Sequence, residues 1–298
     1  MKISLKTQAI LALVIVAVGV SLLNLVVRLM DEGFEPFTQV YLRIACGFLL
    51  ALPLFWTSLR WRAIGTTPLR DWPLLFLMGS VGYSVPVYLI TLGALQAKLV
   101  NVSVLSATIP IFVYMYSLLF LKIKMQAIVF PLIIISLWGI DIIATKSFFL
   151  SFTAFGLGEL YVVLSAATFA WFSVGRKLLT SHLNDREVTL LVMLIAACCS
   201  FAFAFMEREI FVWHHLTNPH VLLGLIIGAI LNIMTILLQI FAFKWIDTVV
   251  GNQILLIGIL FSLLLGFLLY HEIISYQEFF GGVIVVSSIY VTNKVVTH

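Results

Sequence analysis

The sequence predicts an all-α integral membrane protein whose ten transmembrane helices form two inverted five-helix repeats. Three observations lead to this prediction. The composition is far more apolar than that of a soluble domain, apolar runs of membrane-spanning length recur from end to end, and a pattern of small and polar residues in the first run returns about half a chain later.

The composition excludes an ordinary water-soluble fold. Hydrophobic residues make up 62% of the 298 residues, charged residues make up 10%, and the mean hydropathy is +1.16. Soluble domains carry about 45–50% apolar and about 25% charged residues, so no soluble core would cover this much apolar surface. The apolar runs leave no stretch for a separate globular domain.

Each predicted span is a run of about 20 mostly apolar residues, because a rise of about 1.5 Å per residue has to cross roughly 30 Å of hydrocarbon. The ten runs are 7–29, 36–57, 71–91, 99–122, 126–144, 153–179, 187–206, 219–242, 249–270 and 276–294. They are continuously apolar rather than alternating, which favours helices over barrel strands. The first run follows Lys2 and Lys6 like a secretory signal, but it is too long for a signal core and further spans follow it.

The distribution of basic residues predicts the orientation. With the amino terminus inside, most Lys and Arg residues fall in the inner loops and at the inner termini. The basic residues of the outer connections are only Arg28, Lys98, Lys146 and Arg208. By the positive-inside rule, both termini are expected in the cytoplasm.

The first and sixth spans carry the same pattern on one helical face. In the first span the pattern consists of Ala17, Ser21, Asn24 and Arg28. The sixth span repeats its spacings with Ala166, Ala170, Ser173 and Lys177. Gly79 and Gly228 match at nearly the same offset. Because the copies lie an odd number of spans apart, the halves 1–147 and 148–298 are predicted to be inverted, with a site near mid-depth between them.

Further motifs tie the chain to a known family. They are GALQA at 93–97 leading into NVSVLS at 101–106 and Pro110, LYHE at 269–272, and Phe169-Ala170 followed by Arg176-Lys177. With them the chain resembles the EamA type of the drug/metabolite transporter superfamily. The first half departs from the family pattern at Lys122, which stands in place of an acidic residue, and at Val18-Gly19, which replaces an aromatic-small pair. The resemblance implies ten helices in two repeated units and an exporter of metabolites, amino acids or drugs.

Polar and aromatic residues at helical spacing predict a pocket inside the bundle. Span eight presents Gly224, Gly228, Asn232, Thr235 and Gln239 on one face. The candidate substrate-binding residues are Asn24, Tyr83, Tyr88, Asn101, Ser106, Tyr114, Trp171, Asn232 and Gln239. Hydrogen bonding between helices without any ligand is the alternative reading of the same residues. Pro86 and Pro110 are predicted kinks, since proline breaks the backbone hydrogen bonds of a helix.

Ionisable residues inside a span are costly and are therefore functional candidates. Arg43 and Glu159 lie at similar depths and are a candidate ion pair, with Asp141 as a rival partner. They either stabilise one another or act on a substrate or a coupling proton.

The sequence contains no motif for metal-dependent catalysis, nucleotide binding or nucleic-acid binding. His214, His215, His220 and the pair His271-Glu272 have no regular metal-ligand spacing, and no nucleotide-binding motif is present. The basic residues are explained by topology, so nucleic-acid binding is not expected. We therefore expect no enzyme activity, no metal and no cofactor.

The expected function is secondary active transport of a small organic solute by alternating access, with the pocket between the repeats. Export rests on the resemblance alone, so a metabolite uptake carrier or a facilitative channel is the alternative. The expected partners are a small-molecule substrate and membrane lipid, with the fifth and tenth helices as candidates for a homodimer contact. The expected location is the bacterial inner membrane.

Overall fold

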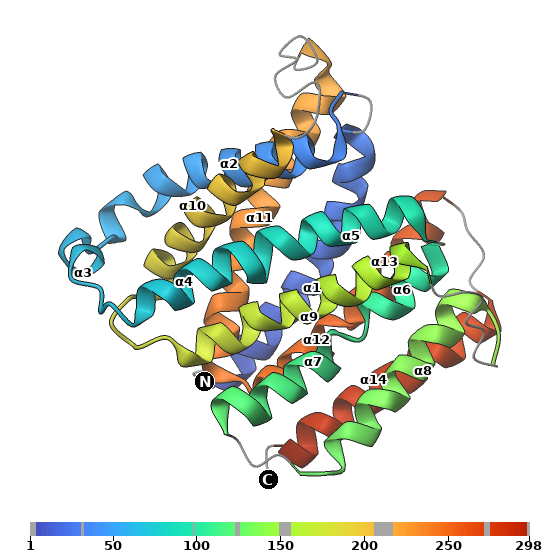
Figure 1. The fold of residues 1–298 in the computed structure, drawn as a ribbon. Coiled ribbons are helices and arrows are strands. Elements are labelled where there is room, and N and C mark those ends of the chain that lie inside the picture. The colour runs from blue at the N-terminus through green and yellow to red at the C-terminus, as the bar shows by residue number, and fades with distance from the viewer. Residues whose placement is uncertain are drawn as a thin grey trace.

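The computed structural model describes residues 4–30, 33–97, 99–122, 126–148, 156–205, 217–270 and 275–296, and within these ranges it contains helices and no strand (Figure 1). The elements in the first half of the chain are α1 (Leu5–Met30), α2 (Pro36–Phe55), η1 (Trp56–Ser58), α3 (Trp61–Gly65), α4 (Asp71–Gly79), η2 (Ser80–Ser84), α5 (Val85–Gln96), α6 (Leu99–Ser106), α7 (Ile109–Tyr116), η3 (Ser117–Leu121) and α8 (Val129–Thr145). Those in the second half are α9 (Leu157–Leu178), α10 (Asp185–Ala204), α11 (Pro219–Trp245), α12 (Thr248–Leu255), α13 (Ile257–Tyr270) and α14 (Tyr276–Val296).

Within the described residues, eight helices are long and apolar enough to cross a membrane. They are Leu5–Leu23, Phe37–Ser58, Asp71–Gly93, Val104–Leu121, Leu157–Leu178, Asp185–Ala204, Pro219–Trp245 and Tyr276–Val296. The predicted spans 126–144 and 249–270 fall on shorter apolar helices, Val129–Thr145 and Thr248–Phe261. The all-helical membrane class predicted from the composition is thus confirmed for the part of the chain that the structure describes.

Three spans are interrupted, and two of the interruptions lie at the predicted prolines. The backbone widens to π-helical turns over Ser80–Ser84, just before Pro86, and the helix breaks between α6 and α7 just before Pro110. Proline has no N–H to donate to the preceding turn, which explains both positions. The break between α12 and α13 at Leu256 was not predicted.

The closest helix pairs each join the first half of the chain to the second. They are α1 with α11, α5 with α9, α2 with α10, and α8 with α14, and Figure 1 shows α8 lying along α14. Large apolar side chains such as Leu54, Phe76, Leu119 and Phe279 remain exposed on the outer faces of the bundle. That surface suits a hydrocarbon solvent, because lipid has no tendency to exclude apolar groups.

Glycines allow the close helix contacts. A Cβ on Gly79 of α4 would lie 2.8 Å from Ile195 of α10, and a Cβ on Gly228 of α11 would lie 2.7 Å from Arg43 of α2. These two glycines match in the sequence repeat, and each brings its helix against a neighbour from the other half. Small residues thus serve the close approach of helices, as they commonly do in membranes.

The contact between α8 and α14 provides a test of this packing. A Cβ on Gly281 would lie 2.6 Å from the carbonyl oxygen of Gly139, and backbone cannot rotate away as a flexible side chain can. We expect Gly281→Ala to lower the free energy of unfolding by about 1–3 kcal/mol. Gly65→Ala is the control, since a Cβ there meets nothing within 4 Å. Thermal unfolding in detergent measures both variants, and equal melting temperatures would contradict the prediction.

Candidate functional site

Tyr83 and Asn232 form a hydrogen bond between the two halves of the chain. The Tyr83 hydroxyl, on η2, donates to Oδ1 of Asn232 on α11 at 2.7 Å, and Nδ2 of Asn232 donates to the carbonyl of Gly228 at 2.8 Å. Both side chains are buried, and the ring of Tyr83 lies 6.0 Å from that of Phe172 on α9. Two predicted site residues thus meet near the middle of their helices.

Arg43 approaches the same place from α2. Its side chain is 8% exposed, its aliphatic stem packs on Gly228, and its Nε donates to the carbonyl of Gln39 at 3.3 Å. Tyr83 is close enough for an electrostatic interaction with the guanidinium. A buried cation therefore lies beside the hydrogen bond that joins the halves.

A small cavity lies between the same helices, and its lining includes Ser84, which follows Tyr83, and Val40, about one turn before Arg43. It has a volume of about 10 Å³, which is room for about one water molecule. Its lining residues are Phe37, Val40, Ser84, Tyr88, Ser200 and Phe203. Ser84 and Ser200 share a hydrogen bond of 2.9 Å, and the ring of Tyr88 lies 4.3 Å from Phe203 and 4.6 Å from Phe37. The predicted site residue Tyr88 thus lines this cavity, together with two serines that the sequence analysis did not select.

Other predicted pocket residues lie elsewhere. Ser106 donates to the carbonyl of Val102 in its own helix at 2.6 Å, and the ring of Tyr114 lies 6.0 Å from Phe130 of α8. Trp171 contacts the edges of Tyr116 and Phe120. Ser106 is thus bonded within its own helix, and Tyr114 and Trp171 contact aromatic rings of other elements, because the rotation of a helix about its axis is set by packing that spacing alone does not reveal.

The remaining candidates fall into two groups. Gln239 of α11 is buried, and its Oε1 has no hydrogen-bond partner in the described part of the chain. The side chains of Asn24 and Asn101 lie outside what the structure describes.

The expected ion pair between Arg43 and Glu159 is not among the ion pairs of the described residues. Glu159 instead accepts a hydrogen bond at 2.9 Å from the backbone N–H of Gly156, at the start of its own helix. Asp141 lies on α8, which packs against α14, and one of its carboxyl oxygens is buried without a hydrogen bond to a described group. A glutamate at N3 satisfies a free N–H of its helix terminus, which explains the partner that Glu159 takes.

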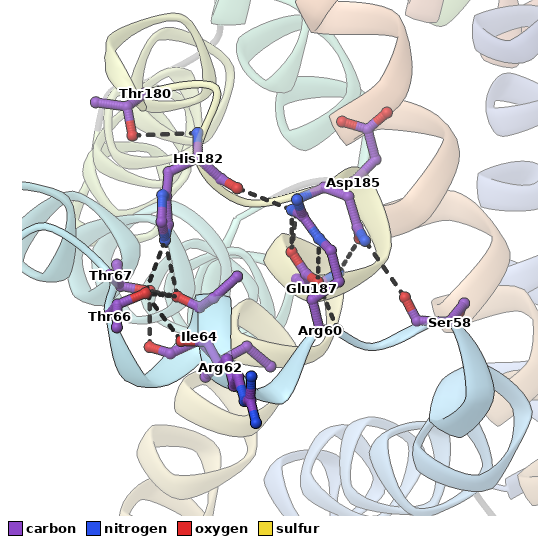
Figure 2. Close-up of polar contacts among 12 residues, drawn as sticks. Ser58, Arg60, Arg62, Ile64, Thr66, Thr67, Thr180, His182, Asp185 and Glu187 are labelled. Carbon is purple, nitrogen blue, oxygen red and sulfur yellow. Dashed lines mark hydrogen bonds and ion pairs between the residues drawn. The ribbon is translucent and has the colours of Figure 1, made fainter.

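A second polar cluster joins the halves where α2 ends and α10 begins (Figure 2). Glu187 is completely buried and accepts four hydrogen bonds of 2.7–3.0 Å, from the backbone N–H and guanidinium of Arg60 and from the backbone N–H of Asn184. The guanidinium also donates to the carbonyl of His182 at 2.8 Å. The hydrogen bond to Glu187, with the charge of that carboxylate, raises the pKa of Arg60 above its ordinary value.

Neighbouring contacts extend this Arg60–Glu187 cluster. His182 lies with Nε2 at 2.9 Å from the carbonyl of Ala63, so this nitrogen carries the proton, and Thr180 donates to the carboxylate of Asp71. Figure 2 shows the linker after α2 packed against the linker before α10. The sequence analysis missed this cluster, although the spacing of Asn184 and Glu187 is that of a helix-capping pair. No local pattern in the sequence predicts the contact between Arg60 and Glu187, which lie 127 residues apart.

Together, the groups around Tyr83 are hydroxyls, amides, aromatic rings and one guanidinium. This set can hydrogen-bond to and stack on an organic solute held between the halves.

Comparisons with known proteins agree with this architecture. The model of the EamA-like transporter family matches residues 7–145 and 156–294, one copy on each half. A crystal structure described only as that of a protein superposes with a TM-score of 0.77, covers 98% of this chain and 97% of its own, and is 14% identical in sequence. That likeness shows the fold alone. No curated protein matches the sequence.

The Arg60–Glu187 cluster generates a prediction about stability. Glu187→Gln places an amide N–H₂ among groups that all donate, so we expect the free energy of unfolding to fall by about 1–3 kcal/mol. Arg60→Gln should cost less, because this side chain is 55% exposed and water can replace its partner. Arg62→Gln, in the same linker, is the control. Thermal unfolding in detergent gives the order, and a Glu187 variant as stable as the control would refute it.

Proposed function

Because this chain belongs to the EamA-like transporter family, we propose that it is a secondary active transporter that exports a small organic solute by alternating access. The family match makes the protein an integral membrane transporter. The substrate class, amino acid, metabolite or drug, and the direction of transport are our proposals. The location we propose is the bacterial inner membrane.

We further propose ten spans in two inverted five-helix repeats, 1–147 and 148–298. The pattern of helix pairs supports this. If span n of the first half corresponds to span n + 5 of the second, the contact of α1 with α11 corresponds to that of α9 with α5, and α2 with α10 and α8 with α14 each correspond to themselves. A two-fold relation between halves predicts such a pattern. The matched roles of Gly79 and Gly228 follow the same rule.

The single observation that carries the transport mechanism is the Tyr83–Asn232 hydrogen bond at mid-span. It joins the halves beside a cavity of aromatic rings and hydroxyls, where a substrate site between repeats is expected. The Arg60–Glu187 cluster joins the same halves at one end of the bundle. We take this conformation to be closed at that end, which we assign to the cytoplasm because Arg60, Arg176 and Lys244 gather there.

Transport by purified protein in liposomes tests the proposal. A carrier should show saturable uptake and counterflow of a solute found by thermal-shift screening of a metabolite library, whereas a channel should show neither. Flux that rises linearly with concentration and shows no counterflow would favour a channel. Net transport toward the cytoplasmic side would contradict export and favour an uptake carrier.

The central hydrogen bond can be tested in the same liposomes. Tyr83→Phe leaves Oδ1 of Asn232 buried without its donor, and we expect transport to fall roughly tenfold. Ser288→Ala is the matched control, because its hydrogen bond to Ser136 also joins the halves but lies between α8 and α14. Equal transport by the two variants would contradict a central role for Tyr83.

Cysteine accessibility tests the inversion. After the native cysteines are replaced by serine, single cysteines at Ser4, Ser181 and Thr217 are labelled with a membrane-impermeant reagent from either side. We expect positions 4 and 181, before α1 and after α9, to react from one side and position 217 to react from the other. Reaction of positions 4 and 181 from opposite sides would show that α1 and α9 run in parallel.

A further inference from the structure

Arg43 is a buried cation without a matching anion. It lies within a predicted span, is 8% exposed, and forms no ion pair in the described part of the chain. Its only hydrogen bond there is the one from Nε to the carbonyl of Gln39. The four N–H donors of the two terminal nitrogens are therefore left for another acceptor. A charged group inside a membrane protein is costly and normally has a partner, so this absence calls for an explanation.

The protein holds the side chain in place without neutralising it. The stem of Arg43 rests on Gly228, whose missing side chain makes the room, and a Cβ there would lie 2.7 Å from Cδ of the arginine. Tyr83 and Asn232, two buried polar side chains from the two halves, satisfy one another at 2.7 Å. Helices α2 and α11 thus hold the guanidinium in position, but no described protein group accepts hydrogen bonds from its terminal nitrogens.

The surroundings of Arg43 match one kind of ligand. Val40, one helical turn before it, and Ser84, next to Tyr83, line the small cavity, together with the stacked rings of Tyr88 and Phe203. A planar guanidinium binds carboxylate in a bidentate manner, and aromatic rings accept an apolar body.

We propose that Arg43 binds the carboxylate of the transported solute, so that the substrate is a small organic acid with an apolar or aromatic body. This inference rests on the proposed transport function and names its substrate class. Since the cavity holds about one water molecule in this conformation, substrate entry requires α2, α5 and α10 to separate around it.

The experiment compares acids with amides of the same shape. The purified full-length protein in zwitterionic detergent is titrated with 3-phenylpropanoate, 3-phenylpropanamide, hexanoate and hexanamide, and its melting temperature is recorded. We expect the two carboxylates to stabilise the protein and the two neutral amides to have little effect. The inference would be overturned if acid and amide stabilised the protein equally, or if neither stabilised it.

Substitutions then assign the effect to the guanidinium. In Arg43→Gln we expect the half-maximal carboxylate concentration to rise at least about tenfold, because a charge-assisted hydrogen bond is lost. Arg43→Lys keeps the charge but not the bidentate geometry, so it should lie between Arg43→Gln and the unmodified protein. Arg62→Gln, an exposed arginine, is the control and should bind like the unmodified protein.

The ligand-free melting temperature separates binding from a structural role. Removal of an unpaired buried charge should leave Arg43→Gln as stable as the unmodified protein or more stable. A large loss of ligand-free stability with unchanged carboxylate affinity would mean that Arg43 only supports packing, and would overturn the inference.

Two further experiments test whether Arg43 binds a lipid headgroup and whether transport depends on Arg43. Stabilisation by phosphatidylglycerol that disappears in Arg43→Gln, without any effect of the carboxylates, would assign the guanidinium to a lipid headgroup and overturn the inference. In phosphatidylcholine liposomes, counterflow of a neutral solute that is insensitive to Arg43→Gln would refute this inference and leave transport standing. Carboxylate binding through Arg43 without any counterflow would refute the transport function but not the binding.

Discussion

Hydrocarbon offers no hydrogen-bond partner to a peptide group, and this constraint decides most of the architecture of this chain. Every span must satisfy its own backbone as a helix, and the described departures from regular α-helix are local, at Ser80–Ser84, before Pro110, at Ser117–Leu121 and at Leu256. Because lipid is as apolar as leucine, the helices are not driven together by the exclusion of water. Close packing at small residues and hydrogen bonds between side chains associate them instead.

The same constraint explains where the polar side chains lie. Most of the described buried hydroxyls hydrogen-bond to a neighbouring helix or to their own backbone, as Ser165 does in donating to the carbonyl of Pro86 at 2.7 Å. Ser173 and Asn252 do the same between α9 and α12. Among the described residues, buried side-chain atoms without a hydrogen-bond partner occur in Gln39, Asp141, Trp171, Gln239, Gln253 and Asn293. Arg43 differs from these because it carries a charge and forms no ion pair in the described structure.

Whether a structural feature could be predicted from the sequence depends on how far apart along the chain the interacting residues lie. Helix positions depend on composition over about 20 residues, and a helix break depends on one proline, so both could be read from the sequence. The meeting of Tyr83 with Asn232 was expected only as membership of one pocket. The orientation of Tyr114 toward Phe130 depends on helix rotation, and the burial of Glu187 under Arg60 depends on a contact across 127 residues. No local pattern encodes these two. The contact of Glu159 with Gly156 is local, and the sequence analysis missed it because it treated Glu159 as half of an ion pair.

The interleaving of the halves has a consequence for how the protein is made. Each of α1, α2, α5 and α8 has its closest neighbour in the part of the chain after residue 156. When the ribosome has completed only the first half, those four helices already lie in the bilayer, but the surfaces they will bury still face lipid. Gly79 and the aliphatic stem of Arg43 then lack Ile195 and Gly228, the residues against which they pack. The first half therefore cannot complete its packing on its own, and each of these four helices reaches its final neighbour only when the second half has been made.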